Sequence, residues 1–478
     1  ENTDGRMTAD GDVALTYKWT NAALDSTTYA TSETGTAITN LFDEADPNKS
    51  SSEPGEVTWL SRSNWVATFP TQPVVLNATQ TLADHLAFTR YDGSKADSVE
   101  MPTLGADNGL ALVSMIGADY DDPQWDTLLD QLTFNEMVNT ITLGFHNTAA
   151  IESIGKTRTK DENGPQGLTA ALTGGASAMC YTSEDVMAAT FNVDLINDVG
   201  RCIGEDCLAM GYSGLYGPGI NMHRTAYCGR NFEYYAEDPF IAGTICAAEV
   251  QGIQSKGVYV YLKHVALNDS ETSRRGVNTW LNEQAAREIY LEVADKAITD
   301  GGAWSVMTGF NRWGAYWCGA YDNLLTGFLR GELGLRGMII TDYSGSSKYM
   351  DLADGLIAGS DIWDSPDPTI HTTLAPKYEN DAYIVTEMRE SMHKILYTVA
   401  NSNAMNGWSS ADRLKVITPW WKTALYALDT VLAVPVAYIA TVAVLTVLCI
   451  WRLVVAIKRK KTWTAEQAAN TASAQNQQ

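Results

Sequence analysis

The hydrophobic pattern in the middle of the chain alternates between short apolar runs and longer segments of helical periodicity. The apolar runs, over 213–217, 257–262, 303–308 and 337–341, are bounded by glycine and polar turns, which is typical of buried strands in a parallel sheet. Helices are predicted over 132–143, 193–210, 282–300, 323–331 and 381–400. This alternation predicts an α/β fold in which crossover helices join parallel strands. Its length, and the lack of a GxGxxG fingerprint in the sequence, favour a (β/α) barrel over a doubly wound sheet.

The pattern changes on both sides of this region. Residues 1–70 are polar, rich in Thr, Ser and Asp, and contain short alternating pieces, which predicts the tail of a preceding β domain followed by a linker. Residues 71–125 are predicted to connect this tail to the barrel domain over 126–400, and residues 401–426 to form a second linker.

One segment near the C-terminus has the composition of a membrane span. The 22 residues from 430 to 451 carry no charge and are mostly apolar, and as a helix they would measure ~33 Å, enough to cross a bilayer. A basic cluster, Lys458 to Lys461, follows. A buried core helix is the alternative, but the run is long and its charged flanks are asymmetric. The sequence therefore predicts a transmembrane helix over 427–457, a cytoplasmic tail over 458–478 and an external barrel.

An external domain ahead of such an anchor needs an export signal, which the sequence does not show. The chain begins at Glu1 without a Met, so we expect it to be a processed protein or the C-terminal piece of a longer one.

Composition narrows the possible partners. The formal net charge of −24 argues against a nucleic-acid partner, which favours a basic face. CxxC and HExxH spacings are missing from the sequence, so nothing in it suggests a metal site.

Polar residues gather where the predicted strands end. Asn163, Arg230, Lys263, His264 and Asp342 hold such positions in the sequence. Parallel barrels place their catalytic groups at the carboxyl ends of the strands, and many charged or strong hydrogen bonds are what a neutral sugar requires. Together these residues predict a pocket for a polyhydroxylated ligand.

Taken singly, each of these residues has a plainer explanation. Asp342 could cap the following helix, Lys263 could be a solvated strand end, Arg230 a surface charge and His264 a hydrogen-bonded core histidine. The pocket hypothesis rests on their recurrence at successive strand ends.

Five motifs make the chain similar to a known family. They occur in the order and approximate spacing of the barrel domain of glycoside hydrolase family 3: NGPQG, GRNFEYYAEDP, KHVALNDSETSRR, MTGFNRWG and LRGELGLRGMIITDY. The resemblance covers roughly residues 100–400 and implies a TIM-like barrel of the β-glucosidase type of retaining exo-hydrolases, which need no metal or organic cofactor.

The resemblance also implies roles for individual residues. Asp342 matches the family's catalytic nucleophile. Arg230, Lys263 and His264 match residues that bind hydroxyl groups of the terminal sugar, and Met307 matches a residue that lines that subsite.

Two matched positions depart from the family pattern. Asn163 stands where the family usually has an Asp that grips sugar hydroxyls. Phe310 replaces the usual Tyr and removes a hydroxyl group close to the nucleophile. Both departures bear on which sugar is bound more than on the reaction.

The leading hypothesis is a membrane-anchored, outward-facing exo-β-glycosidase, most simply a β-glucosidase, that hydrolyses terminal sugars from oligosaccharides or other β-glycosides. In β-glucosidase-type members the acid/base is a Glu on an α/β sandwich domain, and some members resemble a permuted order with sandwich and fibronectin-type domains before the barrel. The residues up to 70 match the tail of such a fibronectin-like domain, so we expect the acid/base upstream of Glu1. The alternatives are a surface carbohydrate-binding protein without turnover and a phosphorylase of the same family.

Overall fold

The computed structural model describes residues 31–50, 57–60, 64–69, 71, 80–86, 90–345, 348–367, 370–417 and 420–475. The chain divides into two compact units, 1–414 and 415–478. The predicted β-domain tail lies largely outside the described residues, so the N-terminal domain assignment stays a prediction.

A parallel sheet of five strands forms the centre of the larger unit, with the strand order β1-β2-β3-β5-β8. Its strands are β1 (Asp161–Asn163), β2 (Gly214–Tyr216), β3 (Tyr259–Val265), β5 (Ser305–Thr308) and β8 (Ile339–Thr341). A small second sheet contains β4 (Asn278–Thr279), β6 (Arg312–Trp313) and β7 (Tyr316–Trp317). The four predicted strands correspond to β2, β3, β5 and β8, which confirms the parallel α/β arrangement.

Two segments outside the named strands, 141–146 and 361–364, join the outer edges of the sheet. Residue 362 pairs in parallel with β8, and the segment around it bonds in turn to 141–146, which bonds to the start of β1. The main-chain hydrogen bonds are Thr341 N to Ile362 O, Trp363 N to Ile141 O, Gly144 N to Trp363 O and Asp161 N to His146 O, all between 2.8 and 3.1 Å. The carboxyl ends of the strands therefore meet around one barrel-like ring.

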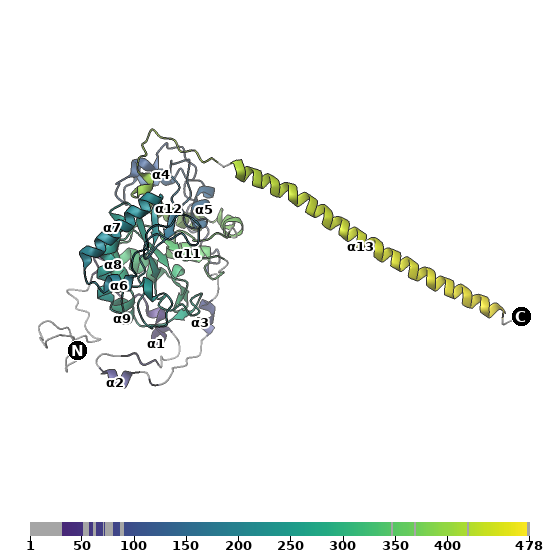
Figure 1. The fold of residues 1–478 in the computed structure, drawn as a ribbon, viewed down its shortest axis with the longest axis horizontal. Helices are drawn as coiled ribbons and strands as arrows, with labels where there is room; N and C mark the ends of the chain where they lie inside the picture. The colour runs from purple at the N-terminus through teal and green to yellow at the C-terminus, as the bar shows by residue number, and fades with distance from the viewer. Residues whose placement is uncertain are drawn as a thin grey trace. The chain divides into compact units, whose positions relative to one another are not determined.

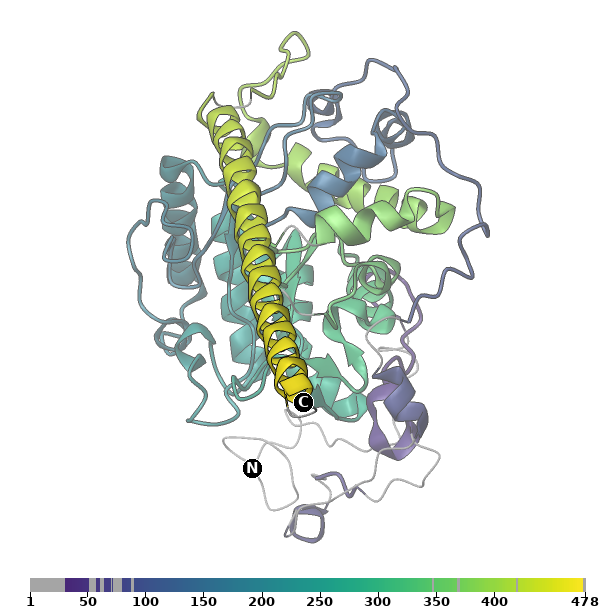
Figure 2. The same cartoon turned by 90° about the vertical axis from the view of Figure 1, so that its right-hand side faces the viewer.

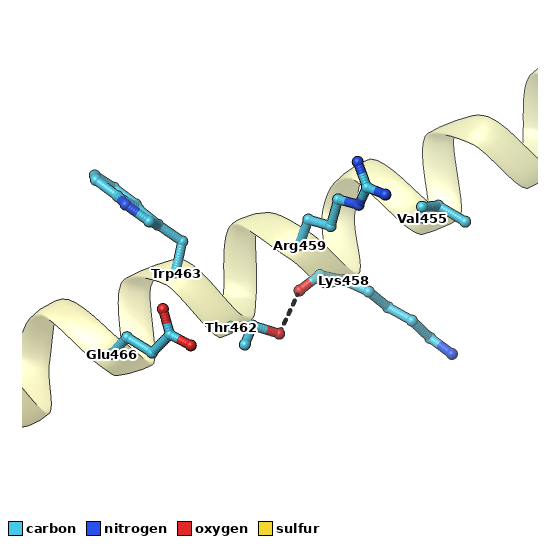
Figure 3. Close-up of a pocket in the computed structure, with 6 residues that line it drawn as sticks. All are labelled: Val455, Lys458, Arg459, Thr462, Trp463 and Glu466. Atoms are coloured by element: carbon cyan, nitrogen blue, oxygen red, sulfur yellow. Dashed lines mark hydrogen bonds between the residues drawn. The ribbon is translucent and has the colours of Figure 1, made fainter.

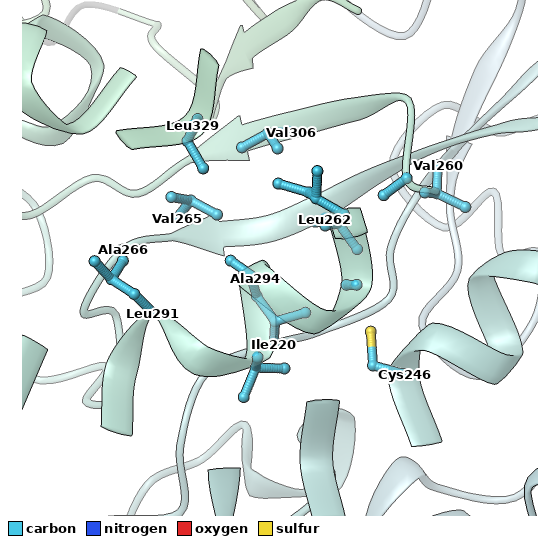
Figure 4. Close-up of a cluster of buried hydrophobic side chains, with 14 of the residues drawn as sticks. Ile220, Cys246, Val260, Leu262, Val265, Ala266, Leu291, Ala294, Val306 and Leu329 are labelled. Atoms are coloured by element: carbon cyan, nitrogen blue, oxygen red, sulfur yellow. The ribbon is translucent and has the colours of Figure 1, made fainter. Parts of the chain in front are cut away.

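The two faces of the strands have different neighbours. Val260 and Leu262 of β3 and Val306 of β5 belong to a buried apolar cluster that includes residues of the outer helices (Figure 4). The alternate residues, such as Tyr261 and Met307, belong to a second cluster. Because side chains alternate along a strand, residues in step with Tyr261 and Met307 face the interior of the ring.

Helices surround the sheet in both views (Figure 1, Figure 2). The longer ones of this unit are α5 (Phe134–Thr142), α7 (Val193–Met210), α8 (Pro239–Gln254), α10 (Glu292–Thr299), α11 (Leu352–Ala358) and α12 (Ala382–Ala400). Shorter ones are α1 (Pro47–Ser50), α2 (Trp65–Thr68), α3 (Gln80–His85), α4 (Gln124–Leu129), α6 (Glu184–Ala188), α9 (Glu283–Ala285) and the 3₁₀ turn η5 (Asn231–Glu233). The predicted helix over 323–331 is a π-helix, η8 (Asn323–Glu332), and the one over 282–300 contains a π-turn, η6 (Ala286–Tyr290). Thr133 caps α5 in a capping box with Glu136.

The described segment before the barrel packs into the larger unit. Phe42 is fully buried, and its ring stacks on that of Trp313 with centroids 4.2 Å apart. The main-chain N–H groups of Leu41 and Phe42 donate to the Glu283 carboxylate at 3.2 and 2.7 Å. At the other end, Asn403 N donates to Gly257 O at 2.8 Å. Residues 31–45 and the start of the predicted second linker are therefore parts of this unit.

The smaller unit contains one long helix, α13 (Trp420–Gln475), which includes the predicted span. Its part over Thr441–Glu466 has a mean hydropathy of 2.0 in its most apolar stretch, none of it buried, and is long enough to cross a membrane. Arg459 and Trp463 lie on one side of the helix and Lys458 on the other (Figure 3). Because successive residues are 100° apart, the basic residues 458–461 surround the helix and do not form a stripe along it.

Candidate active site

A register shift in β3 turns two consecutive side chains toward the same site. Lys263 pairs with Met307 and Val265 with Thr308, so His264 is an extra residue in the strand. Such bulges re-aim side chains that would otherwise point to opposite faces. The main chain of His264 is held on both sides by Asn221, whose Oδ1 accepts from His264 N at 2.9 Å and whose Nδ2 donates to His264 O at 3.0 Å. The sequence placed Lys263 and His264 after the strand, whereas they are part of it.

Asp342 follows β8 directly and is 9% exposed. Its Oδ1 accepts from Tyr343 N at 2.7 Å, and its Oδ2 lies 3.3 Å from His264 Nε2. Arg230 Nη1 donates to the same His264 nitrogen at 3.4 Å. Because an arginine N–H can only donate, this nitrogen is an acceptor. Within the described part of the chain Asp342 Oδ2 has no hydrogen-bond donor, so this oxygen is available to react.

Arg230 and Lys263 are linked through Glu233, which the sequence analysis did not select. Arg230 donates to both oxygens of the Glu233 carboxylate, and the Lys263 ammonium lies 3.8 Å from it. Burial raises the pKa of Glu233, but Lys263 and Arg230 outweigh it and hold that pKa below its ordinary value. Glu233 therefore orients two cations beside Asp342.

Electrostatics separate the ionisation states of Asp342 and His264. Burial raises the pKa of Asp342 above its ordinary value, while Arg274, Arg230 and Lys263 oppose that rise. Burial and the same three cations hold the pKa of His264 far below its ordinary value. His264 is accordingly neutral, and Asp342 depends on its cationic neighbours to be ionised.

Arg274 is a second residue that the sequence analysis missed. Among the neighbouring charges, that of Arg274 does most to lower the pKa of Asp342. Its guanidinium carbon lies 4.7 Å from the centre of the Phe310 ring, and its Nε lies 3.2 Å from the Glu271 carboxylate. The signal was present in the sequence, because Arg274 belongs to the KHVALNDSETSRR motif. Spacing alone, however, does not say which of the charges in this motif faces the strand end.

The remaining predicted residues lie at different depths. Met307 is buried in β5 beside Lys263, and Phe310 is buried with its main-chain oxygen accepting from the Tyr349 hydroxyl at 2.9 Å. Asn163 is half-buried at the end of β1. In the described part of the chain, no hydrogen bond or ion pair joins Asn163 directly to Asp342.

Two further groups occupy the ring between β8 and β1. Asp364 is buried, and its Oδ1 accepts from the Tyr216 hydroxyl at 3.2 Å. His146 Nδ1 lies 3.1 Å from Glu162 Oε1. Burial lowers the pKa of His146, but the hydrogen bond to Glu162 and the charge of Asp364 raise it overall. Neither Asp364 nor His146 stands in a motif that marks its chemistry.

Comparison with known proteins gives one consistent relationship. Residues 145–371 match the family model described as the glycosyl hydrolase family 3 N terminal domain. The chain is 34% identical over 251 residues to beta-glucosidase B of Emericella nidulans, covering 52% of this chain and 29% of that protein. It is 33% identical over 244 residues to thermostable beta-glucosidase B of Acetivibrio thermocellus, covering 49% of this chain and 32% of that protein. The chain thus spans about a third of the length of these curated relatives.

Solved structures agree. Beta-glucosidase 3B from Thermotoga neapolitana, in complex with alpha-D-glucose, matches with a TM-score of 0.53 and 26% identity, over 60% of this chain and 44% of that one. Beta-glucosidase from Kluyveromyces marxianus, in complex with glucose, matches with a TM-score of 0.52 and 27% identity, over 57% and 34%. The family match contains the site residues from His146 to Asp364. Residues 145–371 are therefore a glycosyl hydrolase family 3 N terminal domain, and this part of the chain is similar to beta-glucosidases.

Proposed function

We propose that this chain is the catalytic barrel of a membrane-anchored, retaining exo-β-glycosidase, most simply a β-glucosidase, and that Asp342 is its nucleophile. The observation that carries this proposal is the environment of Asp342: a buried carboxylate with one unpaired oxygen, at the carboxyl end of a barrel strand, surrounded by three cations. The family relationship and the beta-glucosidases among its relatives support it.

In the proposed reaction Asp342 Oδ2 attacks the anomeric carbon as the bond to the leaving oxygen breaks, which gives a glycosyl ester. Water then attacks the same carbon and releases Asp342. A retaining enzyme needs a second carboxyl group, ~5–5.5 Å away, that protonates the leaving oxygen and later deprotonates the water. We assign this acid/base to a domain of the protein outside the present chain, expected to be an α/β sandwich.

Arg230, Lys263 and His264 would hold hydroxyl groups of the terminal sugar. Met307 and Phe310 would line the same subsite, and Asn163 would contribute at its edge. The charged donors also favour the ionised state of Asp342, so binding and activation of the nucleophile use the same cations.

A sugar-binding protein without turnover is the second candidate. The identities of Asn163 and Phe310 favour it, because each lacks a group that the family usually supplies near the sugar. Turnover therefore decides between the two functions.

The test is hydrolysis of a panel of aryl β-glycosides by the full chain, with Arg230→Ala as the matched variant. Loss of a charged hydrogen bond costs roughly 1.5–3 kcal/mol, so kcat/KM for the preferred sugar should fall at least tenfold. An unchanged kcat/KM would remove Arg230 from the sugar site. Binding of a monosaccharide without hydrolysis of any glycoside would select the second candidate.

The pH dependence of the reaction should show how the neighbouring cations affect the pKa of Asp342. The nucleophile must be ionised, so activity is lost as pH falls through the pKa of Asp342. Arg274→Met removes the first of the charges that lower this pKa, so the acidic limb of the kcat/KM profile should move to higher pH. Lys256→Met, at a surface ion pair with Glu205, is the control and should leave the limb in place. A limb that does not move in Arg274→Met would show that this charge does not act on the nucleophile.

The topology is testable on intact cells. If α13 crosses the membrane with its basic cluster inside, added protease should release the barrel unit and leave the tail from Lys458 protected. A barrel that survives protease until the cells are opened would contradict the external placement.

A further inference from the structure

Asp364 occupies the position on segment 361–364 that Asp342 occupies after β8. Ile340 and Ile362 are paired in parallel, and each aspartate comes two residues after its member of the pair. Residues two apart on a strand point to the same side, so Asp364 faces the interior of the ring beside Asp342. Neighbouring strands are ~4.8 Å apart, which lets one pyranose ring contact both carboxyl groups.

The backbone fixes this register from both sides. Asp364 N donates to Thr341 Oγ1 at 3.0 Å, and Ser344 N donates to Asp364 O at 3.0 Å. Thr341 and Ser344 bracket Asp342 in the sequence, so the two aspartates belong to one connected piece of backbone. A movement of one strand end would carry the other with it.

The groups around Asp364 come from three directions. His146 faces it from segment 141–146, Tyr216 from β2 and Asp342 from β8, with Arg230, Lys263 and Arg274 behind Asp342. Burial raises the pKa of Asp364 to about 7; His146 and the Tyr216 hydroxyl oppose the rise, and the charge of Asp342 adds to it. Burial and the charge of Asp342 thus favour the protonated, neutral form of the Asp364 carboxyl group.

We propose that Asp364 is a specificity-determining residue that binds a hydroxyl group of the sugar held over Asp342. This inference rests on the proposed function for the identity of the ligand. A neutral carboxyl group has one donor and spare acceptor capacity, which suits a sugar hydroxyl. Asp364 also lies on the same ring as Asn163, two segments away, and would supply a carboxyl group to a site whose usual one is an amide here.

A cation-binding site between Asp342 and Asp364 is the alternative interpretation, and the charges around the pair disfavour it. Asp342 already has Arg230, Lys263 and Arg274 as neighbours, and a further positive charge would be repelled by them. A neutral, hydrogen-bonding ligand meets no such repulsion.

The experiment pairs substitutions with substrate analogues. Asp364→Ala and Asp364→Asn are measured in the full chain on aryl β-glycosides of the preferred sugar and on its 2-, 3-, 4- and 6-deoxy analogues. We expect Asp364→Ala to lower kcat/KM for the parent sugar at least tenfold and to have little effect on the one analogue that lacks the contacted hydroxyl. Asp364→Asn keeps a donor and an acceptor and should lose less. Asp354→Asn, whose carboxylate accepts from Arg90 N and Tyr91 N, is the control and should treat all analogues alike.

Two results would overturn the inference. One is an equal fold loss on every analogue in both Asp364 variants. The other is a loss that grows with poorer leaving groups and disappears with good ones, which would make Asp364 a proton donor to the leaving oxygen. Binding of free glucose and its deoxy forms, followed by the shift in Tm, needs no turnover. If the wild type binds sugar but hydrolyses no glycoside, the proposed function fails while this pattern still tests Asp364.

Discussion

Asp342→Asn should lower kcat by at least ~10⁴-fold, the scale on which loss of a catalytic nucleophile acts. The substitution keeps the shape of the side chain and removes the charge that attacks the anomeric carbon in the proposed reaction. Since burial disfavours an ionised Asp342, the variant should fold at least as well as the wild type at neutral pH. Sugar binding should persist, because the proposed donors Arg230 and Lys263 remain.

Covalent labelling identifies the nucleophile directly. A 2-deoxy-2-fluoro glycosyl fluoride should form a stable ester with the wild-type chain, and peptide mapping should place it on Asp342. The matched variant Glu233→Gln keeps Asp342 and should still be labelled, although more slowly. An adduct on Glu233 or Glu271 in the wild type would show that the nucleophile is misassigned.

The second large effect concerns the leaving group. General acid catalysis is worth roughly 10²–10⁴-fold in rate. In the proposed mechanism the acid/base belongs to a domain outside this chain. The chain by itself should therefore be slow on unactivated disaccharides and much less impaired on aryl glycosides whose leaving groups depart without a proton. The measurement is kcat/KM against leaving-group pKa, for this chain alone and for this chain joined to the proposed acid/base domain.

The slopes of these two plots of kcat/KM against leaving-group pKa show where the acid/base lies. A steep slope for the chain alone, flattened when the proposed domain is present, supports an acid/base on that domain. A flat slope for the chain alone would mean that a proton donor is already present in the barrel. Addition of azide, which replaces water as nucleophile, should not change the slope of the first step.

The periodic parts of the fold could be predicted from the sequence. Helix α7 begins and ends where its pattern does, and β2, β3, β5 and β8 follow apolar runs. Asp342 could be selected because a buried strand ends just before it. These elements bury apolar side chains on regular faces, so their sequences record the period.

The parts that lack a period could not be predicted. Helix α8 is apolar on nearly all sides because it is buried between the sheet and other helices, so no polar face marks it. Strand β1 reads DEN and looks like a loop; its Asp161 points into the ring, where the hydroxyls of Tyr259 and Tyr261 donate to it at 2.6 and 3.2 Å. Asp364 lies on a segment with one bridge pair, and its pairing with β8 depends on contacts far apart in the chain.

The structure brings the predicted residues Arg230, Lys263 and His264 together beside Asp342, but the residues that orient them were not predicted. Lys263, His264 and Arg230 stand in recognisable motifs, whereas Glu233 and Arg274 matter through what they orient. A register shift that turns both Lys263 and His264 inward is also invisible in the sequence, because alternation would send one of them outward.

The packing of Phe42 determines where a stable fragment of this protein can begin. A barrel fragment that starts at residue 71, where the composition changes, would uncover the face of Trp313 and leave the Glu283 carboxylate without two of its N–H donors. Such a fragment would expose an aromatic surface and would tend to aggregate. A fragment for crystallisation should instead keep the chain from residue 31 or earlier and stop near residue 414, where the larger unit ends.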